Sequence, residues 1–135
     1  MNPDRKVFVY GTLKPGGHYW PEFCEGKLAA APQAAKIRGE LYDLHVGYPG
    51  LLLQGDTWVR GYVLEMATEA DFLRLDDLEG YAPGRPEAEN EYNRLRVACF
   101  SPAGEPLGEV WAYEMTAATR ARHGGTLMES GDWPV

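Results

Sequence analysis

One glutamate stands where a carboxylate could act as an acid or a base. The segment 68–80 carries a helix-capping pattern at Thr68 and Asp71 and ends in a glycine, which is typical of a helix stop. With about 100° of rotation per residue, Glu79 falls in the same apolar stripe as Phe72 and not on the charged face. The pattern therefore predicts a helix that aims the Glu79 carboxylate at the core.

Such a carboxylate is costly unless it is paired, hydrogen-bonded or neutral. Asp76 lies three residues before Glu79 on the same face. Burial and a like charge both raise the pKa of a carboxyl group from about 4.3, and buried glutamates reach about 8 or 9. Glu79 is thus a candidate proton acceptor. A structural interpretation stays open, because Glu79 in the last turn could also reach solvent or pair with Arg94.

A second candidate site is the stretch Tyr10-Gly11-Thr12-Leu13, which follows a run of apolar residues. A glycine at a strand end lets the main chain turn and lets another group approach it closely. Main-chain N–H groups exposed at Gly11, Thr12 and Leu13 would suit a carboxylate or an oxyanion. Taken on its own, Tyr10 is better explained as a core aromatic residue at the strand end than as a catalytic phenol.

The elements that must position these residues are mostly strands. Short apolar segments separated by glycine and proline predict a β-rich domain with many turns. We expect strands at 6–10, 36–44, 49–53, 57–66 with a bulge at Gly61, 92–100 and 107–115, the last two joined as a hairpin, and a short helix at 116–123. The predicted fold class is α+β: a small, mostly antiparallel β-barrel with one to three flanking helices.

Length and charge restrict the function. A chain of 135 residues is expected to form one domain over 1–135. Its formal charge of −7, from 20 acidic and 13 basic residues, argues against nucleic acid and anionic membrane surfaces as partners. The apolar run near the N-terminus is too short for a signal peptide or a membrane span, so we expect a cytoplasmic protein.

Cysteines and histidines give no sign of a metal. Cys24 and Cys99 are far apart and lack metal-ligand spacing, so free buried thiols are favoured over a disulfide. His18, His45 and His123 are equally scattered. We therefore expect no metal site.

The chain resembles the γ-glutamylcyclotransferase-like family, which includes the γ-glutamylamine cyclotransferases. The matching residues run through nearly the whole chain in order: Tyr10-Gly11-Thr12-Leu13, Gly39-Glu40-Leu41-Tyr42, Tyr48-Pro49, Gly61, Leu75-Asp76, Glu79-Gly80, Tyr92, Arg94, Trp111-Ala112-Tyr113 and Ser130-Gly131-Asp132-Trp133. One departure is the long segment 81–91 between the Glu-Gly pair and the Tyr-x-Arg strand. A loop of this length beside the site could form a lid over the leaving-group pocket or restrict what enters it.

The resemblance implies a small β-barrel and an enzyme that works on γ-glutamyl amides or amines, releasing pyroglutamate without a cofactor. It implies that Glu79 is the general acid and base and that residues 10–13 bind the glutamyl part of the substrate. Tyr92, Arg94 and Tyr113 join them as expected substrate-binding residues, although strand packing is an open alternative for all three.

Two other function classes remain open from the sequence. The domain could bind a small amino-acid derivative without catalysis, or it could be an interaction domain in which Glu79 is an ion-pair partner. A poised base beside the glycine turn favours the enzyme, because a binder does not need one. The leaving amine and the oligomeric state are not determined by the sequence.

Overall fold

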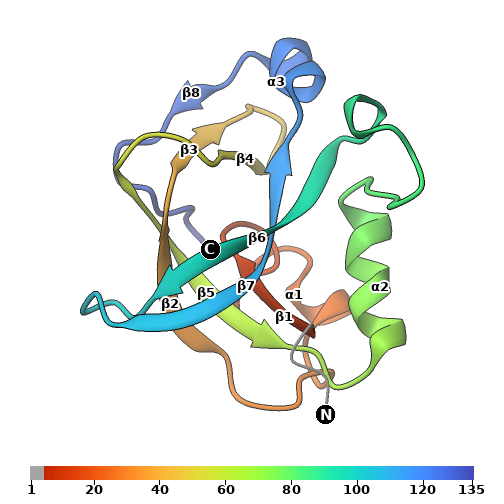
Figure 1. The fold of residues 1–135 in the computed structure, drawn as a ribbon, viewed down its shortest axis with the longest axis vertical. Coiled ribbons are helices and arrows are strands. Elements are labelled where there is room, and N and C mark those ends of the chain that lie inside the picture. Colours follow the sequence, from red (N-terminus) through yellow and green to blue (C-terminus); the bar gives the residue numbers. More distant parts are fainter. Residues whose placement is uncertain (1–4) are drawn as a thin grey trace.

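The structure, a computed structural model, describes residues 5–135. Five strands close into a barrel in the order β1–β5–β2–β6–β7, and all their pairings are antiparallel except that of β1 with β7 (Figure 1). Their bounds are Lys6–Val9 (β1), Trp58–Glu65 (β5), Gln33–Arg38 (β2), Tyr92–Phe100 (β6) and Pro106–Met115 (β7). The prediction of a small, mostly antiparallel barrel is confirmed.

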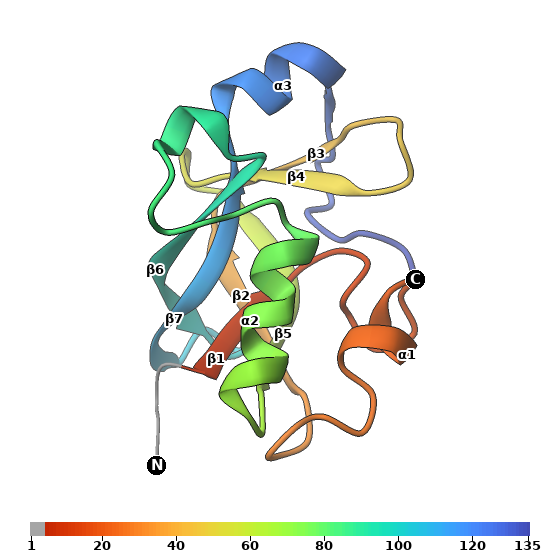
Figure 2. The same ribbon diagram turned by 90° about the vertical axis from the view of Figure 1, so that its right-hand side faces the viewer.

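A second sheet and short helices surround the barrel. The sheet has the order β4–β3–β8, and its strands are Pro49–Leu52 (β4), Glu40–Asp43 (β3) and Thr126–Leu127 (β8). The helices are Trp20–Phe23 (α1), Glu69–Leu78 (α2), Glu87–Glu89 (the 3-10 helix η2) and Ala117–His123 (α3). Helix α2 lies along the barrel beside β1, whereas the second sheet and α3 lie together at one end (Figures 1 and 2).

Strand β1 is buried on both faces, which explains its unbroken apolar sequence. Because successive side chains of a strand point to opposite faces, Phe8 and Tyr10 enter one hydrophobic cluster, and Val7 and Val9 enter another. The second cluster also contains Phe72 of α2. Leu78, the last residue of α2, packs against this cluster as well, so the ends of β1 and α2 are brought to the same region.

Two sequence predictions about strands are wrong. The expected strand 36–44 is divided at Gly39 between the barrel and the second sheet. A side-chain carbon at Gly39 would lie 3.0 Å from the carbonyl oxygen of Leu52, so glycine allows the chain to cross there. Gly61 forms no bulge, since β5 keeps its register with both neighbours, and it makes room for the Val9 carbonyl instead. The irregularity lies between Cys99 and Phe100.

Helix α2 begins after the predicted capping residue and ends before the predicted glycine. The side chain of Thr68 accepts a hydrogen bond from the N–H of Asp71 at 3.1 Å. Gly80 has a φ of +66°, which glycine adopts without strain. Helix α3 matches the segment 116–123, whereas α1 and η2 were not expected.

Candidate active site

A cavity of about 140 Å³ opens where β1, α2 and β6 meet. It contains every predicted site residue except Arg94. Among residues 5–135, no lysine, arginine or histidine lines it. The lining residues are Phe8, Val9, Tyr10, Gly11, Thr12, Leu13, Tyr19, Tyr48, Pro49, Leu78, Glu79, Glu91, Tyr92 and Tyr113.

Glu79 is held at the cavity by the way in which α2 ends. It is the C-cap residue, and its N–H donates to the carbonyl of Leu75 at 3.0 Å. The N–H of Tyr81 donates to the carbonyl of Asp76 at 3.0 Å, and that of Gly80 to Asp77 at 3.3 Å. These two bonds form a Schellman motif, which closes the last turn. The main chain of Glu79 is therefore fixed and does not belong to a frayed helix end.

The surroundings of Glu79 all disfavour its charged form. Burial, the charge of Glu91 and the charge of Asp76 together raise the pKa of Glu79 to about 8, and burial is the largest cause. Its proton can therefore be lost and regained near neutral pH, as acid–base catalysis requires.

The turn after β1 presents main-chain donors to the same cavity. The N–H of Lys14 donates to the carbonyl of Gly11 at 3.1 Å, which closes the turn. Within residues 5–135, the N–H groups of Gly11, Thr12 and Leu13 donate to no main-chain oxygen. A side-chain carbon at Gly11 would lie 2.8 Å from two ring carbons of Pro49. Glycine is therefore needed here because the Pro49 ring packs against the main chain.

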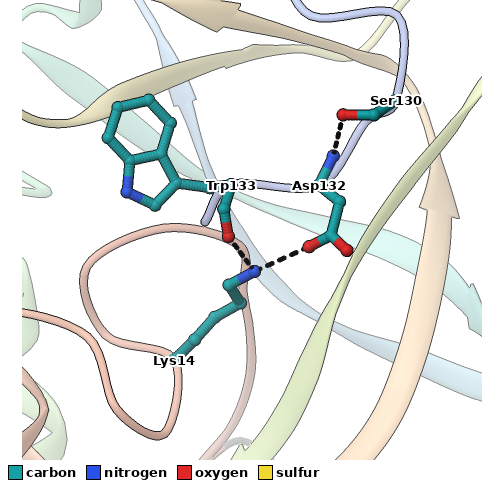
Figure 3. A network of polar contacts seen from close by, with 4 residues as sticks. All are labelled: Lys14, Ser130, Asp132 and Trp133. Carbon is teal, nitrogen blue, oxygen red and sulfur yellow. Dashed lines mark hydrogen bonds and ion pairs between the residues drawn. The ribbon is translucent and has the colours of Figure 1, made fainter. Parts of the chain in front are cut away.

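A buried lysine ties this turn to the C-terminal segment, as Figure 3 shows. Lys14 is 4% exposed, and its Nζ donates to Asp132 Oδ1 at 2.9 Å and to the carbonyl of Trp133 at 2.5 Å. Ser130 Oγ accepts from the N–H of Asp132 at 3.2 Å. No local sequence pattern marks Lys14 as a functional residue. Its partners lie 118 and 119 residues away, so only the fold reveals this support.

The predicted tyrosines form walls of the cavity. Tyr10 Oη donates to the carbonyl of Tyr113 at 2.7 Å, Tyr113 Oη donates to Asp76 Oδ1 at 2.7 Å, and Tyr92 Oη donates to the carbonyl of Pro49 at 2.8 Å. Burial, as the largest cause, raises the pKa of all three phenols well above the usual value. They are neutral groups whose protons are already committed to the protein.

Arg94 is placed next to Asp76 instead of in the cavity. Its Nη1 lies 3.3 Å from Asp76 Oδ2, and its side chain is 13% exposed. The guanidinium also lies 4.7 Å from the ring centres of both Phe72 and Trp111. Arg94 thus pairs with the neighbour of Glu79 on α2 and not with Glu79. Burial raises the pKa of Asp76, which the Tyr113 hydrogen bond and Arg94 oppose.

The segment 81–91 does not cover the cavity. Of this segment, Glu91 alone appears among the lining residues of the described chain. Asn90, which is 3% exposed, organises the loop: its Oδ1 accepts from Arg85 Nε at 2.7 Å, and its Nδ2 donates to Asn93 Oδ1 at 2.7 Å. These hydrogen bonds hold the loop, and with it Glu91, in place. Glu91 was not among the predicted site residues.

Two further observations concern residues 5–135 as a whole. No helix among them has the length and apolar character needed to cross a membrane, and no group of three or more His, Cys, Asp or Glu side chains could hold a metal ion. Cys24 and Cys99 are buried free thiols, as expected.

Comparisons with known proteins agree with this arrangement. The family described as "Gamma-glutamyl cyclotransferase, AIG2-like" matches residues 7–135. A gamma-L-glutamyl-butirosin B gamma-glutamyl cyclotransferase from Niallia circulans is 35% identical over 108 residues, which cover 79% of this chain. The match spans 65% of the length of that relative.

Two solved structures have the same fold. Protein YtfP from Escherichia coli is 26% identical with a TM-score of 0.63, and the match covers 95% of each chain. An AIG2-like protein (GGACT) from Mus musculus is 27% identical with a TM-score of 0.58, over 85% of this chain and 78% of that one. The family match over nearly the whole sequence, together with this shared α+β fold, shows that the chain belongs to the gamma-glutamyl cyclotransferase, AIG2-like family.

Proposed function

We propose that this protein is a cyclotransferase that acts on small γ-glutamyl amides or amines. The α-amine of the glutamyl group attacks the γ-carbonyl, and pyroglutamate and a free amine are released. The observation that carries the proposal is the Glu79 carboxyl, with a pKa of about 8, in the same cavity as the main-chain donors of residues 11–13. No cofactor is needed, because the reaction moves only protons and one acyl group.

The proton balance fits one carboxyl group that is used twice. An α-amino group has a pKa of about 8, so proton transfer to a group of the same pKa is close to balanced. Ring closure converts the α-ammonium into a lactam N–H and so releases two protons. The departing amide nitrogen takes up two protons when it leaves as an ammonium. Glu79 would accept each proton from the first nitrogen and pass it to the second.

The turn after β1 would hold negative charge on the substrate. Attack on the γ-carbonyl produces an oxyanion, and the α-carboxylate is negative throughout. The N–H groups of Gly11, Thr12 and Leu13 line the cavity without main-chain partners, so they are available for either group. One such donor is worth about 3 kcal/mol in an acyl-transfer transition state.

The walls of the cavity fit a shielded reaction. Tyr10, Tyr92 and Tyr113 surround Glu79 with neutral groups, and we propose that they contact the glutamyl chain without donating protons. Arg94 would act through Asp76 and not on the substrate. The named reaction of the Niallia circulans relative supports the proposed reaction class. A cytoplasmic location, the lack of a cofactor and a single domain over 1–135 remain predictions.

A product assay tests the proposal. The protein is incubated with a panel of γ-glutamyl amines and γ-glutamyl peptides, and pyroglutamate is measured by mass spectrometry. We expect product with at least one substrate and a loss of 10²-fold or more in Glu79→Gln. Asp77→Asn is the matched control, because Asp77 is an exposed carboxylate of the same helix outside the cavity.

Two results would count against the proposal. Unchanged activity in Glu79→Gln would remove Glu79 from the mechanism. Binding of γ-glutamyl compounds in calorimetry without any pyroglutamate would favour a non-catalytic binding domain of the same fold.

A further inference from the structure

A second carboxylate, Glu91, marks the mouth of the cavity. It is the exposed member of the lining set, whereas the other lining residues are buried or half-buried. Its side chain packs on the residue after Glu79: a side-chain carbon at Gly80 would lie 3.0 Å from Glu91 Cβ and 3.3 Å from Glu91 Cδ. Glu91 is thus beside the proposed acid–base group and on its solvent side.

The main chain of Glu91 is held from both directions. Its N–H donates to the carbonyl of Gly80 at 3.1 Å. Its carbonyl accepts from the N–H of Thr116 at 3.0 Å and from Thr119 Oγ1 at 2.8 Å. Thr119 is 1% exposed, so this anchor is part of the core. A carboxylate on a fixed main chain loses less freedom when it pairs with a ligand than one on a mobile loop.

The surroundings of Glu91 suit a cation. No basic side chain among residues 5–135 lines the cavity, whereas the half-buried rings of Tyr19 and Tyr48 do. Aromatic faces and a carboxylate both attract ammonium groups. Burial, and after it the charge of Glu91, raise the pKa of the Tyr48 phenol, so this ring lies near the Glu91 carboxylate. Arg85 donates to the Gly80 carbonyl and Arg122 lies near Tyr48, but neither arginine lines the cavity.

The position of the reacting groups assigns this mouth to the leaving amine. The glutamyl part must place its γ-carbonyl and its α-amine near Glu79, and the N–H groups of the turn 11–13 can hold only its negative oxygens. The rest of the substrate must then extend past the exposed end of the cavity, where Glu91 lies. If Glu91 instead served the α-ammonium, every γ-glutamyl substrate would depend on it equally.

We propose that Glu91 selects γ-glutamyl amines whose leaving part carries a second ammonium group a few carbons from the bond that breaks. This inference rests on the proposed function and specifies its substrate class. A leaving part that is neutral is accepted less well, and one that carries a carboxylate is disfavoured by like charge.

Three substrates of matched length test the proposal. They are the γ-glutamyl conjugates of 1-aminopentane, 1,4-diaminobutane and 4-aminobutanoate, which have the same chain length and end in a methyl, an ammonium and a carboxylate group. We expect kcat/KM of the wild-type protein to be about three- to five-fold higher for the diamine than for the neutral conjugate, the upper part of the range for one exposed ion pair. The aminobutanoate conjugate should be the poorest.

The variants are read as ratios between substrates, so that a general loss of folding or activity cancels. Glu91→Gln should bring the diamine-to-neutral ratio to within about two-fold of one, and Glu91→Lys should favour the aminobutanoate conjugate. Glu89→Gln is the matched control, because Glu89 is an exposed carboxylate of the same loop outside the cavity, and it should keep the wild-type ratio.

The outcomes separate the two proposals. Release of pyroglutamate from all three conjugates with equal kcat/KM would overturn the role of Glu91 and leave the proposed function standing. An equal loss with all three conjugates in Glu91→Gln would assign Glu91 to the glutamyl part and overturn the selection. If no γ-glutamyl compound yields pyroglutamate, the proposed function fails, and this inference fails with it.

Discussion

Replacing Glu79 by glutamine should stabilise the protein at high pH. The pKa of Glu79 is about 8 in the folded chain and about 4.5 in the absence of these surroundings. A carboxyl group whose pKa is raised by folding does not lower the free energy of unfolding below its unfolded pKa. Above that pH it lowers the free energy of unfolding more and more, until the pH passes the folded pKa. The wild-type protein therefore loses stability between about pH 4.5 and pH 8, and glutamine, which has no charge to bury, does not.

The size of this effect follows from the shift. A difference of about 3.5 pKa units corresponds to about 5 kcal/mol at most, since one unit is about 1.4 kcal/mol. Most of this lies between pH 5 and pH 9, so the stability of Glu79→Gln relative to wild type should rise by up to about 4 kcal/mol over that range. A gain of stability at the expense of activity is common for strained active sites.

Urea unfolding at pH 5, 7 and 9 measures the difference directly. Both proteins are followed by tryptophan fluorescence, and their free energies of unfolding are compared at each pH. Asp77→Asn, an exposed carboxylate on the same helix, serves as the control and should parallel wild type. A Glu79→Gln curve that stays within about 1 kcal/mol of a constant offset would refute the reasoning, because it would mean that Glu79 is not held in an environment hostile to charge.

Three other predictions follow from single contacts or from the same pKa. The kcat/KM for a γ-glutamyl amine should increase about ten-fold per pH unit below pH 8 and level off near it, and a profile that is flat from pH 6 to 9 would contradict Glu79 as the base. Gly11→Ala should lower the melting temperature, because the new carbon would lie 2.8 Å from the Pro49 ring; an unchanged thermal scan would show that this ring can move. Lys14→Met should cost about 1 to 3 kcal/mol in urea unfolding and raise KM, because it frees the turn 11–14 from Asp132 and Trp133; an effect on stability without any change in KM would separate the lysine from the site.

Local signals predicted the parts of the fold that depend on nearby residues. The capping pattern at Thr68 and the glycine at position 80 place the two ends of α2 within a residue or two. The stripe that contains Phe72 and Glu79 indicates which side of this helix faces inward, and the structure places both residues as expected: Phe72 in the core and Glu79 on the cavity. The stripe can be recognised in the sequence because it repeats with the period of the helix. The two ends can be recognised because capping depends on neighbouring residues.

The features that the sequence analysis missed depend on contacts between distant segments. Alternation continues across Gly39, so nothing local reveals that the chain changes sheets there. Lys14 meets Asp132 only because the C-terminal segment returns to the first turn. Arg94 could pair with either of two carboxylates, Asp76 or Glu79. The sequence spacing does not show which, and the structure pairs it with Asp76.

The titration of Glu79 itself tests the account most directly. With the glutamate side-chain carboxyls labelled with ¹³C, the Glu79 resonance is assigned by its loss in Glu79→Gln and followed by NMR from pH 3 to pH 10. We expect a midpoint near 8 for this carboxyl. A midpoint near 4.5, as for a carboxyl group in water, would contradict the proposed proton transfer through Glu79.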